Sequence, residues 1–371
     1  MNYQSIFELF NDITRTNLDK TAYRYKSGGV WRSVSWGHTA ETCKRISKSL
    51  MALGVKKGDR VTILSQTRLE WVQCDFGIVN CGGVTVGIYP TNLAVDCAYI
   101  INHCEAEIIF VENQEQLHKI QQVRKTLPKL LHIIIFDGSS STDGKVLSFA
   151  DFLRKGEKVT EAEFQARAKA IRSEDLASLV YTSGTTGVPK GAMITHGNLL
   201  FTSDSAAQCL YLEPYFETLL FLPLAHVFAR LVVYFCLNKA LTIAFAESIE
   251  KVADNLKEIR PHFICSVPRI FEKIYEKITT GVRAVGGIKE KLFRWALAVG
   301  YEVSRRQQNQ QPIPAALQFK HNLANKLVLH KIQQAFGGRL VWAVSGAAPL
   351  NKSIAEFFHA CGVLILEGIG M

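Results

Sequence analysis

Apolar and polar positions follow two spacings along nearly the whole chain. Short, continuous apolar runs are separated by longer segments in which apolar residues recur at helical spacing. The runs predict strands and the longer segments predict helices. Continuous apolar strands between helices are typical of a parallel sheet covered on both faces, so we expect an α/β fold. The expected strands are 60–64, 84–88, 106–111, 131–136, 177–181, 192–195, 219–222, 241–245, 263–267, 340–345 and 363–366.

The expected helices begin and end at residues that suit those places. Ser248 can cap a helix over 249–259, which Pro261 would end, and Pro268 can begin the next helix. The Gly-, Ser- and Asp-rich stretch 137–144 is the clearest break in the pattern. The other expected helices are 69–80, 95–103, 114–126 and 353–360, together with a long helical region, 289–336, that a polar loop interrupts at 307–314.

Composition is that of a globular protein with ample material for a core. The chain has 371 residues, of which 48% are hydrophobic and 20% charged. We expect approximate subdomains of 1–175 and 176–371, which can be intertwined. The longest apolar stretch, 219–237, contains a proline, a histidine and an arginine, so no membrane-spanning helix is expected. The polar N-terminal residues are unlike a signal peptide.

The nine cysteines are scattered along the chain. Their number is odd, and none of them forms a Cys-x-x-Cys pair. We therefore expect reduced thiols in the core of a cytoplasmic protein, and neither disulfides nor zinc ligands.

The chain carries a formal net charge of +10. Basic residues gather at 119–129, 154–172 and 283–306, and solvated helix faces explain each group adequately. An anionic substrate or an anionic membrane surface would explain them as well. No basic strand with interleaved aromatic residues is present, so we expect no nucleic-acid partner.

One motif, TSGTTGVPKG, points to phosphate chemistry. It spans Thr182 to Gly191, between two expected strands. Its glycines allow tight turns, its backbone N–H groups can form an anion-binding nest, and its four hydroxyl groups can bond phosphate oxygens or a metal ion. Pro189 stands before the lysine, so the motif differs from the Walker loop. The residues expected to bind phosphate are Thr182, Ser183, Gly184, Thr185, Thr186, Gly187 and Lys190.

This string resembles the phosphate loop of the adenylate-forming superfamily, which includes acyl- and aryl-CoA synthetases, luciferases and peptide-synthetase adenylation domains. The resemblance implies a large N-terminal AMP-binding domain with two stacked, mainly parallel sheets flanked by helices. By the same resemblance, 182–190 would hold the β- and γ-phosphates of ATP, and Thr182 would help to hold Mg²⁺. The small C-terminal domain of that family, which supplies a lysine and part of the CoA site, is expected to be missing from the 371 residues.

A second motif, PLAHVFAR, contains His226. A single histidine beside apolar residues is usually part of a core, but the resemblance places His226 near the substrate carboxylate and the α-phosphate. The string PLAHVF, and the string SVPRIFEKIYEKI over 266–278, are similar to long-chain acyl-CoA synthetases. An apolar acyl tunnel is expected near 221–235 and 241–245, although core packing explains those residues equally well.

Two further strings resemble the adenine-binding part of the family. SGAAPL is physically a tight strand-to-helix turn, and the resemblance implies that it lines an adenine pocket. EGIGM matches the start of the family's G-Y-G-x-T-E motif, but Ile369 stands where an aromatic residue usually stacks, and the Thr and the Mg²⁺-binding Glu would come after Met371. The residues concerned are Gly346, Ala347, Ala348, Pro349, Glu367, Gly368, Ile369 and Gly370.

The implied reaction converts a fatty carboxylate and ATP to acyl-AMP and pyrophosphate and then transfers the acyl group to CoA. Thr182, Lys190 and His226 are the expected catalytic residues. The alternatives are an aryl- or medium-chain acyl-CoA synthetase and a non-catalytic binding protein on the same fold. We expect the 371-residue chain to bind nucleotide weakly and to turn over poorly. Any contact with a membrane is expected to be peripheral.

Overall fold

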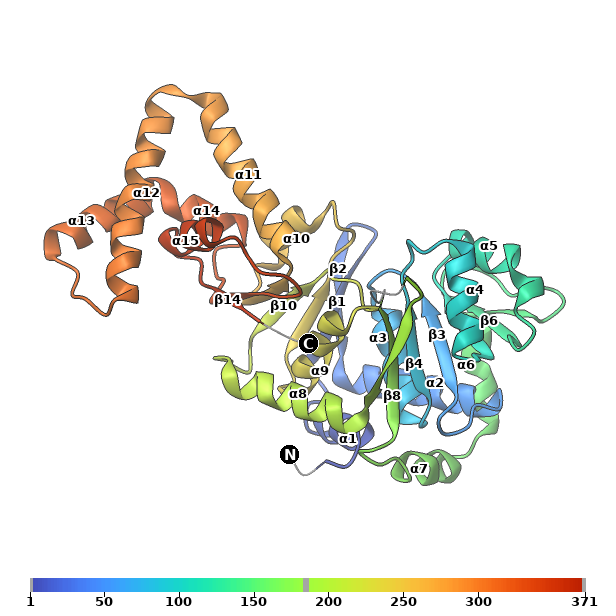
Figure 1. Cartoon of the computed structure of the whole chain (residues 1–371). Coiled ribbons are helices and arrows are strands. Elements are labelled where there is room, and N and C mark those ends of the chain that lie inside the picture. The colour runs from blue at the N-terminus through green and yellow to red at the C-terminus, as the bar shows by residue number, and fades with distance from the viewer. Residues whose placement is uncertain (1–2, 183–186, 369–371) are drawn as a thin grey trace. The chain divides into compact units, whose positions relative to one another are not determined.

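The chain forms two compact units, shown in the computed structural model of Figure 1. The structure describes residues 3–182 and 187–368. Unit 1 consists of Met1–Pro214 and Leu222–Phe245, and unit 2 of Tyr215–Phe221 and Ala246–Met371. The subdomain boundary expected near residue 175 stays a prediction.

The strands form two seven-stranded sheets with mainly parallel pairing, as expected. One sheet lies in unit 1, in the order β7-β6-β5-β3-β4-β8-β9, and its pair β8–β9 is antiparallel. Of the strands in the other sheet, those of unit 1 have the order β11-β1-β2 and those of unit 2 the order β14-β13-β12-β10. In unit 1 the strands are β1 Thr21–Ser27, β2 Val30–Ser35, β3 Arg60–Leu64, β4 Val84–Ile88, β5 Ile108–Val111, β6 His132–Ile135, β7 Val146–Ser148, β8 Leu176–Thr182, β9 Lys190–Thr195 and β11 Thr242–Phe245. In unit 2 they are β10 Glu217–Leu220, β12 Phe263–Ser266, β13 Trp342–Ser345 and β14 Ile365–Glu367.

Helices cover both faces of the first sheet in unit 1. The connections through α4 and α5 run toward the β7 edge of the sheet, whereas the connection through α3 runs toward the β9 edge. Because crossovers between parallel strands are right-handed, α4 and α5 lie on one face of the sheet and α3 lies on the other. Side chains of α4 and α5 join those of β3 to β6 in one buried cluster. The helices are α1 Ile6–Thr16, α2 Trp36–Ala52, α3 Leu69–Asn80, α4 Ala94–His103, α5 Gln114–Gln122, η1 Arg124–Thr126, α6 Phe149–Lys155, η2 Gly156–Lys158, α7 Glu161–Lys169, α8 His196–Cys209 and α9 Val227–Asn238.

In unit 2 the helices α11 and α12 form a long hairpin that extends away from the strands of that unit, and α13 lies against α12 (Figure 1). Pro268 is the first residue of α11, as expected. The elements are α10 Val252–Ile259, α11 Pro268–Val285, α12 Gly287–Gln308, α13 Ala315–Ala324, the π-helix η3 Asn325–Leu329, α14 His330–Ala335 and α15 Lys352–Ala360. Within 3–182 and 187–368, no helix is both long and apolar enough to cross a bilayer.

Several sequence expectations about element ends were wrong, and β5, β13 and β14 each begin two residues later than expected. Ser248 does not cap α10, because the Lys251 N–H bonds to the Ser248 carbonyl at 3.2 Å and residues 248–251 form a separate turn before the helix. Strand β10 begins and ends two residues earlier than expected. All nine cysteines are free in the structure, with eight of them buried and Cys209 exposed, and the expectation of reduced thiols stays a prediction.

Candidate functional site

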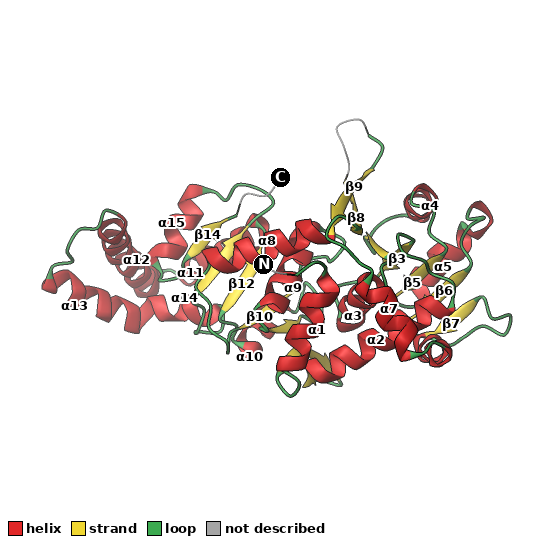
Figure 2. Cartoon of the chain, turned by 90° about the horizontal axis from the view of Figure 1, so that it is seen from below, coloured by secondary structure: helices red, strands yellow, loops and turns green. Residues whose placement is uncertain are grey.

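The phosphate-loop motif joins β8 to β9 in an antiparallel hairpin (Figure 2). The register pairs Thr182 with Lys190, so the two residues lie opposite each other where the strands meet the loop. Both are exposed, and Lys190 forms no ion pair with any described residue. Gly187 has φ +84°, a conformation that favours glycine. The predicted ligands Ser183, Gly184, Thr185 and Thr186 lie outside the described residues.

Helix α4 supports the base of this hairpin. The Tyr99 hydroxyl donates a hydrogen bond to the Pro189 carbonyl at 2.9 Å, and the Tyr181 hydroxyl lies 2.6 Å from His103 Nδ1. The rings of Tyr99 and Tyr181 pack edge to face. A Cβ atom on Gly191 would lie 3.3 Å from the Tyr181 ring, so glycine permits the close fit. These contacts hold the residues on both sides of the loop.

His226 occupies the N-cap of α9. Its Nδ1 accepts a hydrogen bond from the Phe228 backbone N–H at 3.2 Å, which in the neutral ring leaves the proton on Nε2. Partial burial lowers the pKa of His226, so the neutral form prevails at pH 7. An exposed imidazole N–H at a helix N-terminus can donate to an anionic oxygen.

The segment before His226 is fixed against the sheet of unit 1. The Thr67 hydroxyl donates to the Leu222 carbonyl at 2.6 Å. Gly87, in β4, faces Ala225, and a Cβ atom on Gly87 would lie 2.7 Å from the Ala225 Cα. A larger residue at position 87 would therefore push the histidine segment away. Neither Thr67 nor Gly87 belongs to a motif recognised in the sequence.

A buried ion pair holds the first turn of α9. Arg230 and Asp75 are 2% and 1% exposed. Their atoms Nη2 and Oδ1 lie 2.6 Å apart, and the Tyr234 hydroxyl donates to Asp75 Oδ2 at 2.9 Å. Arg230 also donates to the Ser178 hydroxyl, which itself donates to the Thr85 carbonyl at 2.8 Å. Burial opposes the charged guanidinium, but the Asp75 charge and Tyr234 outweigh it and raise the pKa of Arg230.

This buried network connects the two predicted active-site segments of unit 1. Ser178 precedes Thr182 by four residues in β8, and Arg230 follows His226 by four residues in α9. The contact between Ser178 and Arg230 therefore couples the position of the phosphate-loop strand to that of the histidine helix. Sequence analysis missed Asp75, because nothing in its neighbourhood marks it as the partner of a residue 155 positions away.

In unit 2, the SGAAPL string forms a loop between β13 and α15. The Gly346 N–H donates to the Ser266 carbonyl of β12 at 3.0 Å. Ala347 has φ +69°, a conformation that is strained for a non-glycine residue and that often marks functional loops. Gly346 is buried, whereas Ala347, Ala348 and Pro349 are exposed, so the loop presents small residues to solvent.

Strand β14 holds the other side of the same loop. Glu367 Oε1 accepts a hydrogen bond from the Leu350 N–H at 2.8 Å, and the Gly368 N–H donates to the Ser345 carbonyl at 2.9 Å. The structure thus brings together, within unit 2, both strings expected to contact adenine. The remaining expected residues, Ile369 and Gly370, lie outside the described residues.

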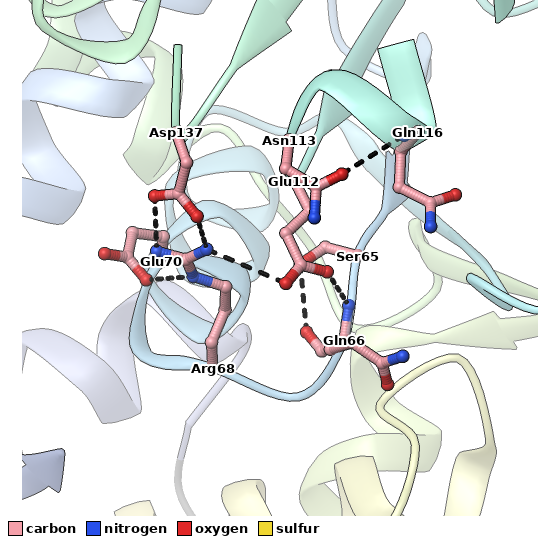
Figure 3. A network of polar contacts seen from close by, with 8 residues as sticks. All are labelled: Ser65, Gln66, Arg68, Glu70, Glu112, Asn113, Gln116 and Asp137. Carbon is pink, nitrogen blue, oxygen red and sulfur yellow. Dashed lines mark hydrogen bonds and ion pairs between the residues drawn. The ribbon is translucent and has the colours of Figure 1, made fainter. Parts of the chain in front are cut away.

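A second charged network lies at the carboxyl ends of β3, β5 and β6 (Figure 3). Arg68 contacts Glu70 at 2.6 Å and Asp137 at 2.5 Å, and its Nη1 lies 3.9 Å from Glu112. Glu112 accepts from the Gln66 N–H at 2.7 Å. Ligands often bind at this edge of α/β sheets, but three carboxylates surround a single guanidinium here. The network therefore joins the strand ends and is unsuited to binding a phosphate.

The described residues contain no cluster of side chains that could bind a metal ion without a ligand. Within 3–182 and 187–368, no three His, Cys, Asp or Glu side chains gather in a way that could hold an ion. The Thr182 hydroxyl is exposed at the phosphate loop. Because Mg²⁺ is commonly held by substrate phosphates, waters and one or two protein oxygens, this arrangement fits an ion that binds together with a nucleotide.

Comparisons with known proteins agree with this arrangement. A family model described as "AMP-binding enzyme" matches residues 9–371. Long-chain-fatty-acid–CoA ligase ACSBG2 of Xenopus laevis is 33% identical over 99% of this chain, and FadD15 of Mycobacterium bovis, with the same ligase description, is 34% identical over 96%. The N-terminal domain of FACL13 from Mycobacterium tuberculosis superposes over the whole chain and 76% of its own, with a TM-score of 0.68 at 18% identity, which shows the fold.

The chain spans about half the length of the curated relatives that it matches, 51% of the Xenopus protein and 58% of the mycobacterial one. Their described activities are those of longer proteins.

Proposed function

Because the chain belongs to the AMP-binding enzyme family of adenylate-forming ligases, we propose that the whole protein is an ATP-dependent, AMP-forming ligase that joins long-chain fatty acids to CoA. The descriptions of the two relatives support the long-chain substrate. The observation that carries the proposal is the hairpin register that sets Thr182 opposite Lys190 at the phosphate loop.

The proposed chemistry starts with attack of a carboxylate oxygen on the α-phosphorus of ATP, which breaks the bond to the β-phosphate, releases pyrophosphate and forms acyl-AMP. A fatty acid is already ionised at pH 7, so this step needs no general base. The difficulty is to bring two anions together, and positioning and charge neutralisation overcome it. The Lys190 ammonium, which forms no ion pair with a described residue, supplies positive charge at the loop. Bound with the nucleotide, Mg²⁺ would neutralise further phosphate charge, with Thr182 among its neighbours.

His226 is proposed to orient the reacting carboxylate or the α-phosphate. Its neutral ring presents an N–H donor and carries no charge that would trap the substrate as a tight ion pair. In the second half-reaction the CoA thiol displaces AMP from the acyl-adenylate. The apolar residues of α9 and β11 are buried in the core of unit 1, so their use as a wall of an acyl tunnel stays a proposal.

Equilibrium binding to the 371-residue chain tests the nucleotide site. We expect Mg·ATP and a non-hydrolysable acyl-adenylate mimic to bind. Lys190→Met should weaken ATP binding roughly ten- to hundredfold, because it removes a charged hydrogen-bond donor. Lys145→Met, which changes another exposed lysine of unit 1, is the matched control and should leave affinity unchanged. Absence of binding by the unmodified chain would overturn the proposal.

Competition between adenylate mimics tests the substrate class. We expect a palmitoyl mimic to bind more tightly than a benzoyl mimic, and pyrophosphate release by the full-length protein to follow the same order. Preference for the benzoyl compound would assign the chain to an aryl-CoA ligase. Binding without any pyrophosphate release by the full-length protein would favour a non-catalytic binding protein. A cytoplasmic location with peripheral membrane contact suits a substrate that partitions into lipid, and we propose it on that ground.

A further inference from the structure

Helix α13 carries an exposed apolar stripe. Phe319 and Leu323 of α13 and Leu327 of the following η3 are spaced at intervals of four residues and are 72%, 42% and 39% exposed. Side chains at this spacing lie on one face of a helix. The less exposed side chains of α13, which are Leu317, His321 and the buried Ala324, lie on a different side of the helix from the stripe. Helix α13 packs against α12 (Figure 1). The stripe is therefore the outer face of the helical layer and not part of the core of unit 2.

Lysines border the stripe on both sides. Lys320 follows Phe319 and Lys326 precedes Leu327, so at about 100° per residue the two ammonium groups fall on opposite sides of the apolar row. Neither lysine forms an ion pair within the described part of the chain, and neither does Lys331 one turn further on. Among residues 3–182 and 187–368, these three basic groups have no ion-pair partner.

The surrounding sequence contains no acidic residue for a long distance. Between Glu302 and Glu356 there is neither Asp nor Glu. Four basic residues of this stretch pair with carboxylates at or beyond its ends: Arg305 and Arg306 with Glu302, Arg339 with Glu217, and Lys352 with Glu356. The segment that contains the stripe therefore carries basic residues and no acidic residue of its own.

We propose that the outer face of α13, with the η3 turn that follows it, docks on the surface of an anionic lipid bilayer. An apolar stripe flanked by lysines can sink below the headgroups while the ammonium groups reach anionic lipids. A protein partner suits the surface less well, because lysine is depleted in protein interfaces. The proposal concerns a surface of unit 2 and does not depend on the ligase activity.

Vesicle sedimentation of the 371-residue chain tests this surface. We expect binding to phosphatidylcholine vesicles that contain about one third phosphatidylserine, weaker binding to phosphatidylcholine alone, and weakening by salt. Phe319→Gln with Leu323→Gln should lower partitioning about tenfold or more. Lys320→Gln with Lys326→Gln should lower it about fivefold for each lysine. Both effects should appear without ATP or fatty acid.

Control substitutions elsewhere distinguish binding through this surface from nonspecific adsorption to the vesicles. Phe201→Gln, at a residue of α8 that is 75% exposed, and Lys145→Gln should leave partitioning unchanged. Equal loss in these controls, or no loss in the α13 variants, would overturn the proposal. A stripe variant that changed the oligomeric state but not vesicle binding would assign the face to a second copy of the chain.

A fluorescence reporter gives a second measurement that does not require loss of the stripe. Cys209 is the exposed cysteine of the described chain, so Cys209→Ser removes the accessible thiol and allows a single label to be placed elsewhere. An environment-sensitive dye on Leu323→Cys should shift to shorter wavelength when anionic vesicles are added. The same dye on Phe201→Cys should not shift. Identical behaviour at both positions would contradict docking through α13.

Discussion

At the scale of single residues, the buried pair of Arg230 and Asp75 shows how the interior supports the site. Ion pairs out of contact with water contribute little net stability, because desolvation offsets their attraction. This pair instead fixes geometry, since Arg230 bonds to a helix, a strand and a tyrosine at once. Its value lies in holding β8 and α9 in one relative position.

We expect Arg230→Met to lower the free energy of unfolding by about 3–5 kcal/mol, because Asp75 would remain buried without its counter-ion. Urea denaturation followed by circular dichroism measures this loss. Asp75→Leu combined with Arg230→Met should cost clearly less than the sum of the two single changes. Additive losses would show that the two side chains do not act as a pair.

His196 gives the protein a pH-dependent stability. It is fully buried, its Nδ1 accepts from the Ile6 N–H at 3.2 Å, and burial lowers its pKa to about 4. The unfolded chain, with a histidine pKa near 6.5, binds the proton more readily, so stability is intact above pH 6.5 and falls as pH decreases toward 4. We expect this residue to contribute a loss of about 3 kcal/mol by pH 4.

His196→Asn keeps an acceptor near the Ile6 N–H but cannot take up a proton in this range. Denaturation at a series of pH values between 7.5 and 4.5 should therefore show a flatter dependence for the variant. Other histidines with lowered pKa, such as His132 and His262, contribute to both proteins and cancel in the difference. Equal slopes for the two proteins would contradict the assignment.

At the scale of elements, the β8–β9 hairpin depends on a helix that is distant in sequence. Its strands pair with each other from Leu176–Thr195 to Thr182–Lys190, but the end of the loop is held by Tyr99 of α4. The aromatic contact between Tyr99 and Tyr181 adds a second attachment. The hairpin sets which residues lie opposite each other, and α4 sets where the loop end lies.

We expect Tyr99→Phe to leave the Pro189 carbonyl without its donor and to lower ATP affinity up to about tenfold, with a stability loss of about 1 kcal/mol. Calorimetric titration and urea denaturation measure the two effects separately. Tyr211→Phe, which removes a hydroxyl bonded to exposed Glu213, is the matched control. A stability loss with unchanged ATP affinity would show that Tyr99 is structural only.

At the scale of the whole molecule, the expected site residues are distributed over both compact units. The phosphate-loop residues and His226 belong to unit 1, and the SGAAPL and Glu367 loops belong to unit 2. The chain passes between the units three times, because β10 belongs to unit 2 while α9 and β11 belong to unit 1. No single cut of the chain separates the two units.

Much of this arrangement could be predicted from the sequence. The boundaries of β3, α3 and β4 agree with the expected ones, because each is a continuous or periodic apolar segment with a glycine or proline shortly before or after it. The first hairpin, β1–β2, was not predicted, since its alternation of polar and apolar residues is weak. The error at Ser248 arose because a turn and a helix start offer the same local signals.

The sequence alone determined the kinds of elements, the phosphate motif and the family resemblance, because each depends on a local segment of ten or twenty residues. Tertiary structure alone decided that Asp75 meets Arg230, that Tyr99 holds Pro189, that Gly87 admits Ala225, and that the stripe of α13 faces outward. The first three are contacts across about 90 to 155 positions, and the fourth depends on which face of the helix α12 covers. Local periodicity cannot encode a partner that only the folded chain brings near.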